Sequence, residues 1–87
     1  MNKRQFKDKV YGELAKITKS MANPHRMEII ELLAQGEVSV EQIAEQTSLP
    51  IANASQHLQV LKQAQLVDVN RQGNFIFYRL SNDNVFK

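Results

Sequence analysis

The chain has no cysteine and no tryptophan, and only three glycines and two prolines among its 87 residues. Without cysteine there are no disulfide bonds, no zinc finger and no thiol redox chemistry, and we expect a cytoplasmic protein. No stretch approaches the ~20 apolar residues that a membrane-spanning helix requires. Residues 1–7 include basic residues, but no apolar run follows them, so a signal peptide is not expected.

Motifs for catalysis and metal binding are also missing. No Ser/His/Asp set, pair of carboxylates or Gly-rich phosphate loop is found, so we predict a protein that is not an enzyme and needs no cofactor. His25 and His57 are the only histidines, and neither stands at ligand spacing from a second metal-binding side chain. We therefore predict no metal site.

Positive charge is unevenly distributed, although the net charge is only +2. The first 26 residues are rich in Lys and Arg, whereas the stretch from Met27 to Leu61 has neither and carries five glutamates. Basic ends around an acidic middle suit contacts with phosphate groups. Charge alone leaves open the alternative of a solvated basic helix.

The first two helices are predicted from apolar spacing and from helix-capping residues. A first amphipathic helix is indicated by Phe6, Val10, Leu14, Ile17 and Met21. Asn23 is a good N-cap and Pro24 suits the first position of a second helix, which we expect to continue until Gly36 allows a left-handed exit.

A short third helix is predicted to start at a capping box formed by Ser39 and Gln42, with Ile43 and Ala44 facing inward. It ends in a turn at residues 47–50, where Ser48 takes the position that glycine most often fills. A fourth helix follows from about residue 51 to 65. Its buried face is predicted to be Ala54, Leu58 and Leu61.

After the fourth helix, the spacing of apolar residues changes from helical to the alternation typical of β-strands. Residues 66–69 and 75–80 are rich in strand formers, and residues 71–74, which include Gly73, are expected to form the loop between them. Phe75 and Phe77 are expected to cover the sheet. The polar residues after Leu80 are typical of the cap of another helix, which would begin just before the last residue, Lys87.

Together these elements predict a mainly α-helical fold with a small β-hairpin, a winged helix-turn-helix of order α-α-α-α-β-β with the start of a final helix. Such a domain reads DNA with the exposed side of its second motif helix. A helical wheel predicts that base edges are read by Asn53, Gln56 and Gln59, with Ser55 on the flank. Phosphates would be held by Lys62, Arg71 and Arg79, and His57 would either touch a phosphate or support the helix.

Several segments resemble the ArsR-type (arsenic-repressor) family. Residues 22–33 look like its second-helix signature, residues 55–61 like its recognition-helix signature, and Gly73 with residues 78–80 like its wing. The resemblance implies a homodimeric repressor that releases operator DNA when a signal arrives. It also implies that the first helix, through Phe6, Val10, Leu14 and Ile17, takes part in dimerisation together with a long last helix.

The chain departs from the metal-sensing members of that family, whose third helix opens with a Cys-x-Cys pair. Ser39 and Glu41 stand at those positions, so that thiolate site is absent. Residues 35–41 and 52–59 are most similar to a subfamily in which a rhodanese domain follows. Residues 1–87 are then one DNA-binding domain at the N-terminus of a longer protein. A winged helix that contacts another protein, without specific DNA binding, is the competing hypothesis.

Overall fold

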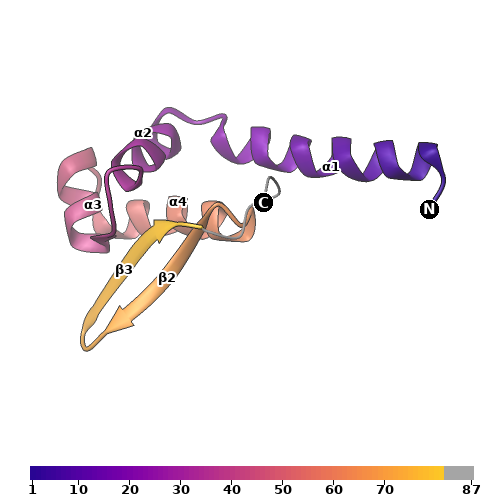
Figure 1. Ribbon diagram of the computed structural model, residues 1–87. Coiled ribbons are helices and arrows are strands. Elements are labelled where there is room, and N and C mark those ends of the chain that lie inside the picture. Colours follow the sequence, from indigo (N-terminus) through magenta and orange to yellow (C-terminus); the bar gives the residue numbers. More distant parts are fainter. Residues whose placement is uncertain (82–87) are drawn as a thin grey trace.

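The computed structural model describes residues 1–81, which form four helices and three strands (Figure 1). In chain order they are α1 (Lys3–Met21), α2 (Pro24–Leu33), β1 (Val38–Ser39), α3 (Val40–Thr47), α4 (Ile51–Gln63), β2 (Val67–Gln72) and β3 (Phe75–Leu80). This arrangement confirms the predicted winged helix-turn-helix. The predicted start of a final helix falls on residues 82–87 and lies outside the described residues.

Helix α1 is long and projects from the rest of the molecule (Figure 1). Its 19 residues span about 28 Å at 1.5 Å per residue, which accounts for the elongated shape of 47 × 25 × 20 Å. A capping box of Asn2 and Gln5 starts it, and its C-terminal end contacts α2 and α4. The helix predicted from apolar spacing is therefore confirmed.

The predicted start of α2 is confirmed, whereas its end differs. The Asn23 side-chain oxygen accepts hydrogen bonds from the backbone N–H groups of His25 and Arg26, at 2.9 and 3.2 Å. The helix stops at Leu33, before Gly36, and a turn continues through Gln35. Gly36 has a φ of +143°, so its conformational freedom serves the approach to β1 rather than the helix end itself.

The three strands form one antiparallel sheet in the order β1-β3-β2. The short strand β1 was not predicted; its residues Val38 and Ser39 pair with Tyr78 and Phe77 of β3. The hairpin also has longer strands and a tighter turn than predicted, because Arg71 and Gln72 belong to β2 and pair with Ile76 and Phe75. The turn is reduced to residues 73–74, with Gly73 at a φ of +62° in the first central position, where two-residue hairpin loops favour glycine.

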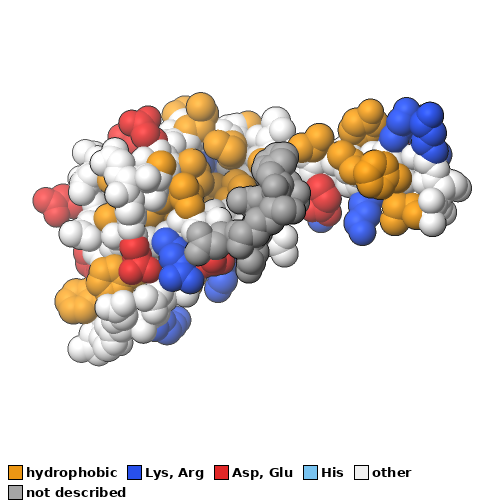
Figure 2. All heavy atoms as spheres, viewed as in Figure 1, with side chains coloured by type: hydrophobic (Ala, Val, Ile, Leu, Met, Phe, Trp, Pro, Cys, Tyr) orange, Lys and Arg blue, Asp and Glu red, His pale blue; other side chains and the backbone are white. Residues whose placement is uncertain are grey.

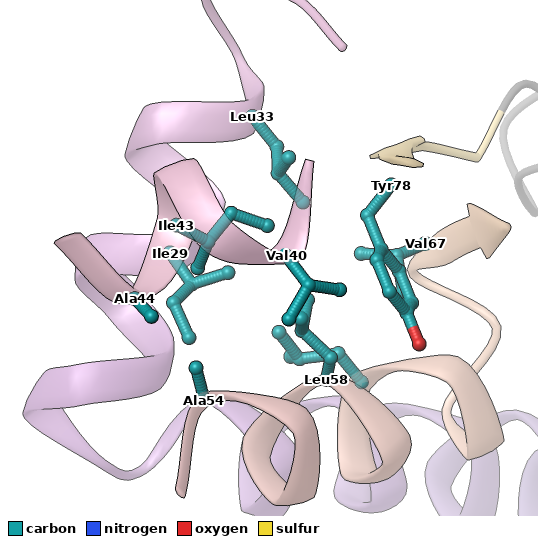
Figure 3. Close-up of a cluster of buried hydrophobic side chains, with 10 residues drawn as sticks. Ile29, Leu33, Val40, Ile43, Ala44, Ala54, Leu58, Val67 and Tyr78 are labelled. Carbon is teal, nitrogen blue, oxygen red and sulfur yellow. The ribbon is translucent and has the colours of Figure 1, made fainter. Parts of the chain in front are cut away.

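The hydrophobic core lies between α2, α3, α4 and the sheet (Figure 3). It is made of Ile29, Leu33, Val40, Ile43, Ala44, Ala54, Leu58, Leu61, Val67 and Tyr78, all buried. The aromatic residue that fills the core from β3 is Tyr78. Phe75 and Phe77 lie together on the other face of β3, with ring centroids 6.4 Å apart; Phe77 is half-buried, whereas 55% of Phe75 is exposed. Helix α1 contributes no hydrophobic residue to this core.

Candidate nucleic-acid interface

The α3–turn–α4 unit is held by local contacts of the kinds that the sequence predicts. Ser39 and Gln42 form the expected capping box, in which the Gln42 N–H donates to Ser39 Oγ at 3.2 Å and the Ser39 N–H donates to Gln42 Oε1 at 3.2 Å. At the other end, Thr47 is buried and its hydroxyl donates to the Ile43 carbonyl at 2.6 Å. Both ends of α3 are therefore fixed without any charged group.

The turn between the two helices depends on Ser48. Its φ of +56° places it in the left-handed region, and the following N–H, of Leu49, donates to the Ala44 carbonyl at 2.9 Å. Ser48 thus fills the position usually taken by glycine, as predicted. Ala44 and Ala54 lie at the contact between α3 and α4 (Figure 3), where their small side chains allow the helices to approach closely.

Helix α4 has one fully buried side and one exposed side. Ala54, Leu58 and Leu61 are completely buried, as predicted. The exposed side carries uncharged amides, namely Asn53, Gln56, Gln59 and Gln63, and Ser55 is half-buried on the flank. The core therefore holds α4 rigidly while it presents a row of side chains that can both donate and accept hydrogen bonds. Helix α4 ends at Gln63, two residues earlier than predicted.

Arg71 and Arg79, which the sequence analysis groups together, lie on opposite faces of the hairpin. In the observed register Arg71 pairs with Ile76 and Arg79 pairs with Asp68. Since side chains alternate along a strand, Arg71 shares the face of the buried Tyr78, near the tip, whereas Arg79 lies on the other face near the base. Burial raises the pKa of the Tyr78 phenol, and the nearby Arg71 charge opposes that rise.

Lys62 belongs with Arg79 rather than with Arg71. Lys62, Asp68 and Arg79 line one hollow of about 550 Å³ beside the C-terminal end of α4. Asp68 lowers the net positive charge of that hollow. Among the basic residues assigned to phosphate, Arg71 is therefore the one nearest the tip of the wing.

His57 faces the joint between α1, α2 and α4 and is half-buried. Its Nδ1 lies 3.3 Å from Nη1 of Arg26, and its ring centroid lies 5.6 Å from that of His25. Burial, followed by the charges of Arg26 and His25, lowers the pKa of His57. Neither the Arg26–His57 contact nor the His25–His57 contact is predicted from the sequence, because the partners lie about 30 positions apart. No cluster of three or more His, Cys, Asp or Glu occurs within residues 1–81.

The four residues assigned to dimerisation form an apolar stripe along α1. Phe6 and Leu14 are 59% and 46% exposed, Val10 is also exposed, and Ile17 is half-buried. Together with Met1, Lys9 and Glu13 they line a hollow of about 500 Å³. Figure 2 shows orange side chains along this helix, with blue Lys and Arg side chains towards its N-terminal end. None of the described helices is long and apolar enough to cross a membrane.

Comparison with known proteins gives matches along most of the chain. Residues 21–70 match the family described as helix-turn-helix domain. The HTH-type transcriptional regulator Rv0324 of Mycobacterium tuberculosis is 41% identical over 73 residues, which are 84% of this chain but only 32% of Rv0324. The transcriptional repressor SdpR of Bacillus subtilis is 35% identical over 65 residues, which are 75% of this chain and 72% of SdpR.

The fold matches solved structures as well. The homodimeric winged helix-turn-helix DNA-binding domain Mb0332 of Mycobacterium bovis, described as a possible ArsR-family transcriptional regulator, superposes with a TM-score of 0.85. Its sequence is 38% identical, and the match covers 94% of this chain and 74% of that domain. The chain therefore belongs to the winged helix-turn-helix family of ArsR-like transcriptional regulators.

Proposed function

We propose that this chain is a homodimeric domain that binds double-stranded DNA sequence-specifically and represses transcription in the cytoplasm. The observation that carries the proposal is the row of exposed amides on α4, opposite a side whose three apolar residues are fully buried. Asn and Gln side chains pair with the edge of adenine in the major groove, and each good bidentate contact contributes about 1–3 kcal/mol of discrimination. Asn53, Gln56 and Gln59 are the proposed reading residues, and Ser55 flanks them.

Phosphate contacts are proposed for the wing and for the N-terminal end of α4. Arg71 lies near the wing tip, and its guanidinium offers several N–H donors to phosphate oxygens. The start of α4 has no side-chain cap, and in its first turn the Asn53 N–H donates to the Pro50 carbonyl, so the N–H groups of Ile51 and Ala52 are the ones proposed to meet a phosphate oxygen. Lys62, Arg79 and His57 are secondary contacts in this proposal, since they lie towards the far end of α4 or face α2.

The second copy in the proposed dimer covers the apolar stripe of α1. Helix α1 contributes no hydrophobic residue to the core, and one side of it carries Phe6, Val10, Leu14 and Ile17. Exposed apolar patches of this kind mark interaction sites. Two copies then place two α4 helices in successive major grooves, about 34–36 Å apart, and the operator is an imperfect palindrome.

Relief of repression by a signal is a further part of the proposal. Because the chain corresponds to only 32% of Rv0324, we place the sensing region outside this domain. Residues 1–87 are then the N-terminal DNA-binding part of a longer protein, and the rhodanese domain expected from the resemblance stays a prediction. In keeping with its relatives, which are named transcriptional regulators, we propose no enzymatic activity for the chain.

Measuring affinity for a random-sequence duplex and a selected duplex at several salt concentrations tests the proposal. The logarithm of the binding constant should fall linearly with the logarithm of the salt concentration, by about 0.9 per phosphate contact. The selected duplex should bind more tightly at every salt concentration. If no salt-dependent binding to either duplex occurs, the competing hypothesis of a protein-binding winged helix is favoured instead.

A further inference from the structure

Three helices meet at Arg26, the residue that joins α1 to α4. Arg26 stands in the first turn of α2 and is half-buried. Its Nε donates a hydrogen bond to the carbonyl oxygen of Ser20, which is buried near the end of α1. Its Nη1 lies 3.3 Å from Nδ1 of His57 on α4. A single guanidinium therefore links the long projecting helix to the proposed reading helix.

The chemistry of the two side chains fixes the tautomer of His57. A guanidinium has only donors, so Nδ1 of His57 must accept and the ring proton must sit on Nε2. Protonation of Nδ1 would set a second donor and a second positive charge against Arg26. The charged or titratable groups that act on the His57 ring are Arg26 and His25 from α2, and Lys16 and Lys19 from α1 line a hollow together with Arg26. None of them is acidic, so the joint favours a neutral imidazole.

His57 lies next to the proposed reading residues, so the Arg26–His57 contact reaches the proposed DNA surface. His57 follows Gln56 directly and lies one helical turn after Asn53, so it is on the reading helix beside two proposed reading residues. Ser20 lies one helical turn after Lys16 and near Ile17, at the end of the apolar stripe. The link therefore runs from the proposed dimer surface to the proposed DNA surface.

We propose that Arg26 is a positioning residue that holds α4 at a fixed angle to α1 through His57, and so sets the separation of the two reading helices in the dimer. The inference rests on the proposed function, since separation matters only when two helices bind one duplex. Loosening the link should weaken binding to a full palindrome, whose half-sites must be reached together. Binding to an isolated half-site should change little.

The test compares Arg26→Met, which keeps the apolar stem, with Lys19→Met, which removes a charge from the same hollow without touching His57. Nitrogen-15 shifts of the His57 ring should report the Nε2–H tautomer and a pKa below about 6.5 in the wild type. In Arg26→Met both tautomers should appear and the pKa should rise. In Lys19→Met the Nε2–H form of His57 should remain the main tautomer, in the same proportion as in the wild type.

The DNA arm uses the palindrome selected by the wild type, the same half-site alone, and palindromes with altered spacing. Arg26→Met should lose about tenfold in the ratio of palindrome to half-site affinity, the size expected for one hydrogen bond to a charged group, and should tolerate altered spacing better. His57→Asn keeps an acceptor at the Nδ1 position and should retain the spacing preference, whereas His57→Leu should lose it. Thermal unfolding of each variant verifies the fold.

Each arm has a result that overturns the inference. Unchanged ring shifts in Arg26→Met would show that the Arg26–His57 contact does not determine the tautomer. An equal loss of affinity for palindrome and half-site would reduce Arg26 to a structural role. If the wild type bound no duplex, the proposed function would fail and the positioning role with it, while the ring shifts would still report the contact.

Discussion

Helix α1 and the body formed by α2, α3, α4 and the sheet use the same kinds of residue in opposite ways. In the body, apolar residues such as Ile29, Ile43 and Leu58 have no exposed surface. Along α1, Phe6 and Leu14 are about half exposed, and Ser20 is the one residue of the helix that is buried. The body thus has a hydrophobic core of its own, whereas α1 is an amphipathic helix whose apolar stripe is exposed.

Helical periodicity therefore predicts an apolar face but not the surface that covers it. Phe6 and Leu14 recur at the same kind of spacing as Ala54, Leu58 and Leu61. Only the three-dimensional structure shows that the apolar face of α4 is buried inside the chain, whereas the apolar face of α1 is exposed. We expect the buried face of α4 to contribute to stability and the exposed stripe of α1 to contribute to assembly.

The largest expected effect is on the body. Ile43 lies on α3 and is fully buried. Ile43→Ala leaves only the β-carbon of the side chain, and should lower the free energy of unfolding by about 2–5 kcal/mol. Leu14→Ala on α1 should change it by no more than about 0.5 kcal/mol in dilute solution. Denaturant unfolding of both variants at low protein concentration measures the contrast. Equal losses would show that α1 is as much a part of the folding core as α3.

A second effect concerns assembly. Replacing Phe6 and Leu14 together by serine should shift the protein towards monomer in sedimentation experiments, because the covered apolar area of the proposed interface is removed. Ala15→Ser, an exposed change well away from the stripe on the same helix, is the control and should leave the distribution unchanged. A double variant that dimerises like the wild type would contradict the assignment of α1 to the interface.

The smallest effect concerns the joint between the two regions. The pKa of His57 is lowered by burial and then by Arg26 and His25, so below about pH 6.5 the unfolded chain binds more protons than the folded one. Stability should therefore fall as the pH drops below that value, and should receive no contribution from His57 well above it. His57→Asn should flatten this dependence in thermal unfolding between pH 7.5 and 5.5. An unchanged profile would show that His57 does not titrate differently in the folded state.

Local signals were enough to predict much of this molecule. The Asn23–Pro24 start of α2, the Ser39–Gln42 box and the buried side of α4 depend on residues within a turn or two of one another, and the structure confirms them. Boundaries were less predictable. Arg71 and Gln72 are polar and resemble loop residues, yet they extend β2 because the exposed wing tolerates polar side chains on both faces.

Contacts between distant segments could not be predicted in the same way. Strand β1 has only two residues and exists because Val38 and Ser39 pair with Tyr78 and Phe77, about 40 positions away. Arg26 and His57 are 31 positions apart, and nothing in either local sequence indicates that they meet. The proposed reading residues were found because they depend on the period of one helix, whereas the residues that position that helix depend on the tertiary fold.

Base reading by α4 can be separated from phosphate binding by comparing Gln56→Ala with Arg71→Ala on the selected operator and on random-sequence DNA. Gln56→Ala should weaken operator binding by about 1–3 kcal/mol and leave random DNA nearly unaffected, since base reading is proposed for the amides on the exposed side of α4. Arg71→Ala should weaken both duplexes alike and lower the salt slope by about one unit. If Gln56→Ala weakened operator and random DNA equally, α4 would not be the reading element.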